Sequence, residues 1–354
     1  MGVTRRTTLA AMAAALAMAG AAAAQEAPLK VGVYGGYFKE AFDQHIFPRF
    51  TEETGIEVES VAEPTGEAWL VQLEQAARAG VAPADVSMMS QVAMRKGMAA
   101  DLWAPLDLAK IPNAENLSDA FVLRNDAGEA VGIGAVAWYV TLVTNTDTYP
   151  EAPESWAFLW DGAGEENLGL LALVSNSFLL EIAAETYFGG TEILDTEEGI
   201  LEVMDKLAEA KPNVRLWYRD EAQFEQGLKT GEIPAGQYYH DVTGLAAADG
   251  FPVRSTFPAE GGVLDSGAWA VTRASDRLED AHAFMDFMSR PEIQALMARQ
   301  VGTAPTVRRE LLDLTDEEFA AVSSEGEPII PRYDLYTDRA DWLNQKWTEL
   351  IVGR

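Results

Sequence analysis

The hydrophobic positions near the start of the chain switch between the spacing of strands and that of helices. Residues 30–34 form a short apolar run, and residues 56–61 alternate between apolar and polar as a half-buried strand does. Between these runs an apolar side chain recurs at every fourth position, as on one face of a helix: Phe38, Phe42, Ile46 and Phe50. This order predicts one βαβ unit, and a helix after residue 65 followed by a strand at 84–90 predicts a second.

The remainder of the chain continues the mixed α/β pattern. Residues 134–145 are apolar and β-rich, and they predict one long strand that crosses between two lobes. Helices are expected around residues 177–188, 197–209, 221–229, 277–288, 291–299 and 340–351. The sequence contains no internal repeat and no long low-complexity linker, so the lobes are expected to form one compact unit.

The first 24 residues are typical of an export signal. Arg5 and Arg6 precede an Ala-rich apolar stretch from Leu9 to Ala24, and three small residues end it. This order predicts a signal peptide over residues 1–24, with cleavage after Ala24. The arginine pair leaves the twin-arginine export route open. No later apolar run reaches the roughly 18 residues that a membrane span needs, so a soluble periplasmic protein is expected.

Composition narrows the function classes. The 354 residues are 48% hydrophobic, enough for folded cores, and 56 Asp and Glu against 26 Lys and Arg give a formal charge of -30. A nucleic-acid backbone would be repelled over most of such a surface, so no nucleic-acid partner is expected. The chain contains no cysteine and three histidines, which excludes disulfides and thiolate zinc sites.

Common catalytic signatures are missing from the sequence. It contains no Gly-x-Ser-x-Gly elbow, no phosphate-binding loop and no His-Glu-x-x-His helix. Residues 132–137 match a dinucleotide fingerprint in form, but a β-rich stretch follows them where the fingerprint needs a helix. Acidic pairs such as Glu52-Glu53 lie in polar stretches typical of solvated helix faces. The sequence therefore predicts no catalytic residue, no cofactor and no metal site.

Two stretches carry a resemblance to a known family. One runs from Val33-Tyr34-Gly35-Gly36-Tyr37 to residue 58, and the other covers residues 257–292, including Asp265-Ser266-Gly267. Together they resemble the periplasmic solute-binding proteins of ABC importers, in the branch that includes spermidine/putrescine-binding and ferric-iron-binding proteins. The resemblance extends over nearly the whole chain after residue 24.

The resemblance implies a two-lobed periplasmic-binding-protein fold of type II, in which each lobe is a mixed sheet flanked by helices. It places residues 25–138 and 267–315 in the first lobe, and residues 139–266 and 316–354 in the second. It also implies that a small solute closes the lobes and that the closed form is delivered to a cognate permease in the inner membrane. Such a protein needs no catalytic residue, and we expect a monomer.

Polyamine binders of this branch hold alkylammonium groups between aromatic rings and carboxylates. Their three acidic positions fall on Asn176, Leu179 and Gly267 here. Asp265 lies two residues before Gly267 and so on the same strand face, and Asp241 lies two residues after Tyr239, so these acids could face the cleft instead. The resemblance therefore implies a small, polar, amine-containing solute. The ligand-binding candidates are Tyr34, Tyr37, Ser90, Asn176, Trp217, Tyr239, Asp241, Asp265 and Thr303.

Three alternatives remain open. Tyr238-Tyr239-His240 resembles the ligand set of ferric-iron binders, although its register relative to Gly231 differs from theirs. A thiamine, phosphonate or amino-acid-like solute would suit the same fold. A secreted enzyme on a two-lobed scaffold is the alternative from a different class.

Overall fold

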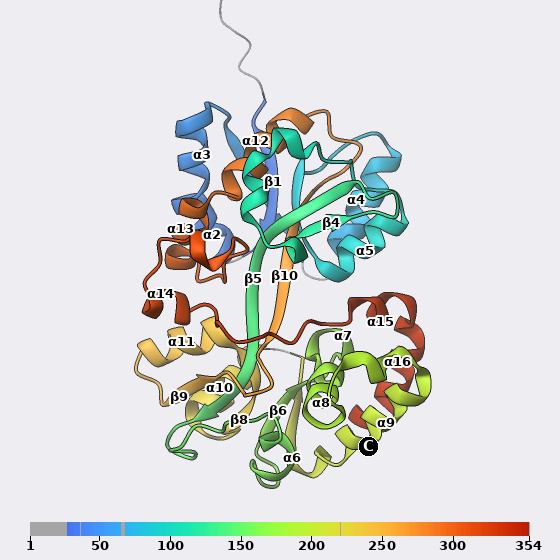
Figure 1. Ribbon diagram of the computed structural model, residues 1–354, viewed down its shortest axis with the longest axis vertical. Helices are drawn as coiled ribbons and strands as arrows, with labels where there is room; N and C mark the ends of the chain where they lie inside the picture. Colours follow the sequence, from blue (N-terminus) through green and yellow to red (C-terminus); the bar gives the residue numbers. More distant parts are fainter. Residues whose placement is uncertain (1–26, 36, 65–67, 220, 354) are drawn as a thin grey trace, which may run out of the picture.

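The protein consists of two α/β lobes joined by long strands (Figure 1). The computed structural model describes residues 27–35, 37–64, 68–219 and 221–353. The predicted signal peptide and the predicted cleavage site lie outside these residues. No helix in the described ranges is long and apolar enough to cross a membrane.

The secondary structure follows the α/β pattern read from the sequence. The strands are β1 (Leu29–Tyr34), β2 (Val58–Glu63), β3 (Val86–Ser90), β4 (Val122–Arg124), β5 (Ala130–Asn145), β6 (Leu168–Leu171), β7 (Val214–Tyr218), β8 (Ala235–Tyr239), β9 (Val253–Thr256) and β10 (Val263–Val271). The helices are α2 (Tyr37–His45), α3 (Phe47–Thr54), α4 (Ala68–Arg78), α5 (Gln91–Ala99), α6 (Phe158–Asp161), α7 (Val174–Ser177), α8 (Leu179–Phe188), α9 (Glu197–Ala208), α10 (Glu221–Thr230), α11 (His240–Ala248), α12 (Leu278–Met288), α13 (Pro291–Gln300), α14 (Asp316–Ala320), α15 (Tyr333–Asp338) and α16 (Ala340–Trp347).

The strands of the described residues form one continuous sheet in the order β2-β1-β3-β10-β5-β8-β6-β7, with β4 and β9 also pairing with β5. Strands β1, β2 and β3 are parallel in the first lobe, and β6, β7 and β8 are parallel in the second. Antiparallel β5 and β10 pair with each other and run between the lobes, as Figure 1 shows. The long strand predicted at 134–145 therefore does cross between lobes, as part of β5.

Side-chain alternation along β10 explains how the first lobe buries both faces of its sheet. Trp269 is fully buried on one face with Phe42 and Phe284, whose rings lie 6.1 and 5.0 Å from it. Ala268 and Ala270 face the opposite side, where α4 and α5 pack. The expected helix with Phe38, Phe42, Ile46 and Phe50 on one face is divided into α2 and α3 at Ile46.

The hydrophobic clusters locate the lobe boundaries along the chain. On β5, Tyr139 packs in the first-lobe cluster and Val140 in that of the second lobe. The chain crosses again within β10, and a third time between Val322 and Ile329. Because Phe319 packs in the first lobe, we place the third crossing after α14, later than the 315/316 boundary expected from the resemblance.

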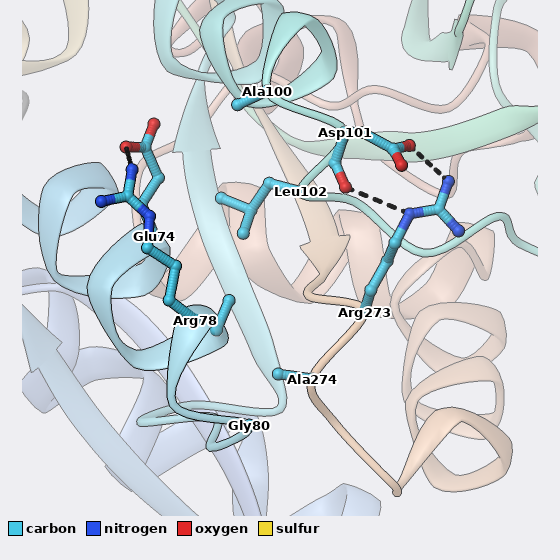
Figure 2. Close-up of a pocket in the computed structure, with 9 residues that line it drawn as sticks. Glu74, Arg78, Gly80, Ala100, Asp101, Leu102, Arg273 and Ala274 are labelled. Atoms are coloured by element: carbon cyan, nitrogen blue, oxygen red, sulfur yellow. Dashed lines mark hydrogen bonds and ion pairs between the residues drawn. The ribbon is translucent and has the colours of Figure 1, made fainter.

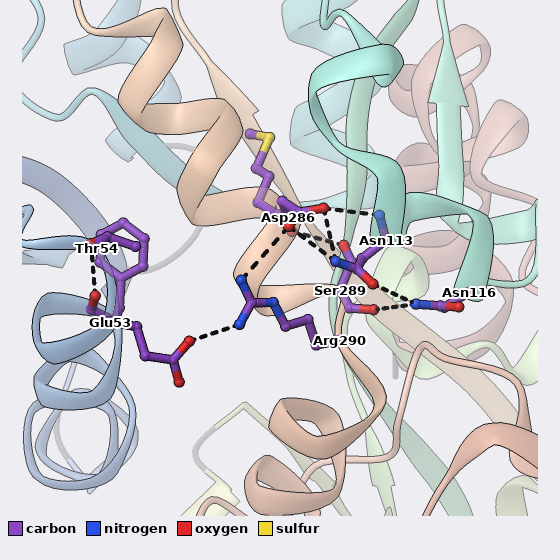
Figure 3. A network of polar contacts seen from close by, with 9 residues as sticks. Glu53, Thr54, Asn113, Asn116, Asp286, Ser289 and Arg290 are labelled. Carbon is purple, nitrogen blue, oxygen red and sulfur yellow. Dashed lines mark hydrogen bonds and ion pairs between the residues drawn. The ribbon is translucent and has the colours of Figure 1, made fainter.

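A polar network fixes the helices of the first lobe relative to one another (Figure 3). The Asp286 carboxylate on α12 accepts hydrogen bonds from the backbone and side chain of Asn113 at 2.9 to 3.0 Å. Arg290 forms an ion pair of 2.7 Å with Glu53 on α3. These contacts join α3, α12 and the turn around residue 113, away from the strand ends that face the second lobe.

His282 on α12 is buried although its position on the helix suggests an exposed side chain. Its spacing places it on an exposed-looking side, yet the residue is only 2% exposed, and its Nε2 accepts a hydrogen bond of 3.1 Å from the backbone N–H of Asp107. The loop that carries Asp107 covers this side of α12. His282 is therefore a structural residue that links the loop to the helix.

Candidate binding site between the lobes

The strand order of the first lobe creates a crevice at a defined place. β1 lies between β2 and β3 in the sheet, so the chain passes from β1 to β2 on one side of β1 and then to β3 on its other side. β1 pairs with β2 along six residues but with β3 only at Val31 and Gly32, so β1 and β3 separate toward their carboxyl ends. Ligands of open α/β sheets bind outside the carboxyl ends of the strands where the order reverses. Here those ends are Tyr34 and Ser90.

The second lobe repeats this arrangement. β6 lies between β7 and β8, and it pairs with β8 only at Leu168 and Gly169. The carboxyl ends at this second reversal are Leu171 and Tyr239. Tyr239 pairs with Val140 on β5, next to the point where the chain passes between lobes. The points where the strand order reverses in the two lobes therefore both lie toward the crossing strands. Together they define one candidate site between the lobes.

Asp265 occupies the centre of this site on crossing strand β10. Its Oδ1 accepts hydrogen bonds of 2.8 Å from both the Ser266 backbone N–H and the Tyr333 hydroxyl. Its Oδ2 has no hydrogen-bond partner among the described residues. The side chain is half-buried, and burial raises the pKa of Asp265 to about 6 although Tyr333 and Ser266 oppose the shift. At neutral pH it is a partly desolvated carboxylate with one oxygen available.

A second acidic group lies on the second lobe. The Tyr239 hydroxyl donates a hydrogen bond of 2.9 Å to Glu221 on α10. Asp241 lies in the first turn of α11, and its Oδ1 is buried without a hydrogen-bond partner among the described residues. Burial raises the pKa of Asp241 to about 6, and the nearby Glu221 charge adds to the shift. The carboxyl groups of Asp265, Glu221 and Asp241 thus favour the binding of a cation at this site.

Tyr34 connects the acidic groups to the first lobe. It is half-buried, and a Cβ on Gly267 would lie 3.3 Å from its hydroxyl oxygen. Burial, with smaller contributions from Glu63 and Asp265, raises the pKa of Tyr34 and keeps the hydroxyl protonated. Gly267 also pairs with Ser90 across β3 and β10. The predicted residues Tyr34, Ser90, Tyr239 and Asp265 are therefore grouped around the crossing strands.

The other predicted residues are placed less directly. Ser90 and Asn176 are exposed, Ser90 as the N-cap of α5 and Asn176 in α7 after β6. Trp217 is half-buried and packs its ring 6.2 Å from that of Trp347, against the second-lobe core. Thr303 is 5% exposed in the turn that pairs with β5 through Ala304. The side chain of Tyr37 lies outside the described residues.

The tyrosine pair and the histidine after it do not converge as an iron site would require. Tyr238 is 3% exposed among Tyr218 and Phe224. Both ring nitrogens of His240 have partners, Nδ1 with Ser255 Oγ at 2.8 Å and Nε2 with the Ala320 carbonyl at 2.9 Å. Within the described ranges, no group of three His, Cys, Asp or Glu side chains could hold a metal ion.

Sequence reasoning missed two residues that bond to site residues and one residue at a neighbouring strand end. Tyr333 and Glu221 contribute the partners of Asp265 and Tyr239. Arg219 follows the carboxyl end of β7, is exposed, and has no hydrogen bond or ion pair among the described residues. The dipeptide Arg219-Asp220, directly after the β-rich residues 214–218, was a usable signal, because polar residues at the carboxyl end of a strand are candidates for ligand contact.

A separate pocket of about 430 Å³ lies in the first lobe (Figure 2). It is lined by residues that include Arg78 on α4 and Arg273 after β10, which pair with Glu74 and Asp101 respectively. Val271 at the end of β10 pairs with Val86 at the start of β3. This pocket is therefore at the amino-terminal edge of β3, opposite the edge that carries Ser90.

Comparison with known proteins gives the family. Residues 46–321 match the family model described as bacterial extracellular solute-binding protein, and the chain belongs to that family. It is 26% identical to the gamma-aminobutyric acid-binding protein of Pseudomonas aeruginosa, over 94% of this chain and 93% of that protein. It is 25% identical to the spermidine/putrescine-binding periplasmic protein of Salmonella typhimurium, over 87% of this chain and 86% of that protein.

Solved structures give the same fold. An ABC transporter substrate-binding protein from Bradyrhizobium japonicum superposes with a TM-score of 0.78 at 20% identity, covering 92% of this chain and 100% of that one. The family and fold confirm the predicted resemblance and the two-lobed α/β architecture. Family membership also confirms the predicted class, a bacterial extracellular solute-binding protein.

Proposed function

We propose that this protein is a periplasmic receptor for a short amine-bearing solute, with a γ-aminobutyrate-like ω-amino acid as the first candidate. The observation that carries the proposal is Asp265, a half-buried carboxylate with a free oxygen between the lobes. An ammonium group placed there would replace water with a direct ionic hydrogen bond. Charge-assisted hydrogen bonds are about twice as strong as neutral ones.

The remaining site residues suit the same group. Tyr34 and Tyr239 offer ring faces, each of which stabilises an alkylammonium by about 0.5 to 2 kcal/mol. Glu221 and Asp241 add negative charge on the second-lobe side. Because these residues come from different lobes, a bound cation would contact both and favour the closed arrangement.

Arg219 distinguishes an ω-amino acid from a polyamine. It is an exposed cation at the carboxyl end of β7 with no partner in the described ranges, so it is available for a carboxylate. A solute with an ammonium at one end and a carboxylate at the other would use both Asp265 and Arg219. A polyamine is the second candidate, favoured by the three carboxyl groups, and it would be repelled by Arg219. Relatives named for both solutes support the choice.

Replacing Arg219 by Gln tests the solute class. We expect at least a tenfold loss of γ-aminobutyrate affinity, about 1.4 kcal/mol, and no loss for putrescine, both measured by calorimetry. Arg49→Gln is the matched control, since Arg49 is also an exposed arginine whose side chain has no partner in the described part of the chain, but it lies on α3 in the first lobe. Equal losses for the two solutes would contradict the assignment of Arg219 to the carboxylate.

The proposal also covers the export route of the protein and its permease partner. The receptor, after export by a signal peptide that permits the twin-arginine pathway, acts as a monomer and delivers its solute to a cognate inner-membrane permease. It carries out no chemical step and uses no cofactor. Among the described residues, one lobe lies within residues 27–139 and 267–322, and the other within residues 140–266 and 329–353. Family membership and the free oxygen of the Asp265 carboxylate support this account.

A further inference from the structure

Glu63 is a buried carboxyl group that the solute contacts leave unused. It ends β2, is 7% exposed, and its Oε1 accepts a hydrogen bond of 3.0 Å from the backbone N–H of Met88 on β3. Strand β1 lies between β2 and β3 in the sheet. The Glu63 side chain must therefore cross β1, and it does so at Gly32, where an added Cβ would overlap Glu63 Oε1.

This crossing is located where β1 and β3 separate. The last pair between these strands is Gly32 with Ser87, so the N–H of the next residue, Met88, has no partner on β1. Glu63 supplies the missing acceptor. A buried N–H without a partner costs about 1 to 3 kcal/mol, so the carboxyl group stabilises the separated arrangement. Trp69 on α4 lies near the same carboxyl group, and its indole N–H donates a hydrogen bond of 3.2 Å to Ser87 Oγ.

We propose that Glu63 is a positioning residue for solute binding, which fixes the spacing of β1 and β3 and thereby places the Tyr34 hydroxyl beside Gly267 and Asp265. The inference rests on the proposed function, because it concerns the same site. Tyr34 lies two residues after Gly32, at the end of the strand that Glu63 crosses. Glu63 acts through Tyr34 and does not contact the solute.

The protonation state of Glu63 gives the proposal a distinctive readout. Burial raises the pKa of Glu63 to about 8, while the bonded Met88 N–H and the nearby Trp69 indole oppose the shift. Near neutral pH the group is mostly uncharged. Of the charged or titratable groups around it, Tyr34 on β1 senses it directly, and Asp265 on β10 faces Tyr34. Ionisation above pH 8 would place an unpaired charge between the strands and draw in water, which alters their spacing.

The test uses the full mature chain and γ-aminobutyrate as probe, with dissociation constants measured by calorimetry between pH 7 and 9. Glu63→Ala should weaken binding at least tenfold, whereas Glu63→Gln, which keeps the acceptor for Met88, should stay within about threefold of wild type. Wild-type affinity should decline above pH 8, and that of Glu63→Gln should stay constant. The solute's own amine, like that of lysine, titrates only near pH 10.

Glu59→Ala, an exposed change on the same strand, is the control and should leave affinity unchanged. Unchanged affinity in Glu63→Ala, or a decline above pH 8 that persists in Glu63→Gln, would overturn the inference. If Glu63→Ala does not fold, the pH profile of Glu63→Gln decides alone. Wild-type protein that binds neither γ-aminobutyrate nor putrescine would instead refute the proposed function.

Discussion

Asp265→Asn should weaken binding of an amine-bearing solute by about 30-fold to more than 1,000-fold at pH 7.5. Removing one member of a desolvated charge pair costs about 2 to 5 kcal/mol, because the other charge is left without its partner. The asparagine keeps an oxygen that can accept from Tyr333, so the neighbouring contact survives. Titration calorimetry with γ-aminobutyrate measures the effect, and Asp249→Asn, at an exposed position after α11, is the control.

The same carboxylate predicts a pH dependence. The pKa values of Asp265 and Asp241 are both raised to about 6 by burial, so each becomes protonated as the pH falls through 6. Affinity for an ammonium should then drop, by about tenfold per pH unit for each proton that must leave on binding. Asp265→Asn should reduce this slope and Asp265→Asn with Asp241→Asn should remove it. A slope unchanged in both variants would contradict the assignment.

The effect on stability has the opposite sign. Raised carboxyl pKa values make a contribution to folding that is complete below the unfolded value near 4 and is lost as the pH rises through about 6. The ligand-free Asp265→Asn protein should therefore be at least as stable as wild type at pH 7.5. Thermal unfolding without solute checks this, and it separates lost binding from lost folding.

Glu181→Ala should lower the stability of the second lobe by about 3 kcal/mol or more. Glu181 on α8 is fully buried, and it accepts hydrogen bonds of 2.8 Å from the Arg332 backbone N–H and 2.7 Å from the Tyr336 hydroxyl. Alanine leaves both donors without an acceptor. These donors hold α15, which also carries Tyr333, so the solute affinity should fall as well.

Denaturant unfolding followed by tryptophan fluorescence measures this loss. Glu181→Gln should be less damaging, since it retains one acceptor and since burial already raises the pKa of Glu181. Glu202→Ala, an exposed change on α9, should stay within about 0.5 kcal/mol of wild type. If Glu181→Ala were as stable as Glu202→Ala, the buried network would not be what holds α15 in place.

Local periodicity was enough to predict much of the fold. The alternation at residues 56–61, most of which form β2, and the apolar run through β5 depend on short-range spacing, which a single sequence displays. Details that depend on tertiary packing were not readable. The helix expected at 177–188 is interrupted at Phe178, a buried residue with a left-handed φ of 52°, and His282 is covered by a distant loop.

Some residues of the candidate site could also be predicted from the sequence, whereas those that depend on tertiary packing could not. Tyr239 could be found at the end of a β-rich segment, and Asp265 because it lies two residues before Gly267 within a recognisable family pattern. Their partners could not, since Tyr333 lies 68 residues from Asp265 and belongs to a helix after the third crossing. Likewise, the passage of Glu63 across Gly32 depends on β2, β1 and β3 lying in that spatial order, which spacing along the chain does not specify.

Equilibrium binding of isotope-labelled γ-aminobutyrate to the mature protein tests most directly whether the two lobes hold a solute without transforming it. The account predicts one molecule bound per chain, recovered unchanged by mass spectrometry, and stabilisation of about 2.7 kcal/mol when the solute is at 100 times its dissociation constant. Conversion of the labelled solute into a product, or binding that Asp265→Asn leaves intact, would contradict it.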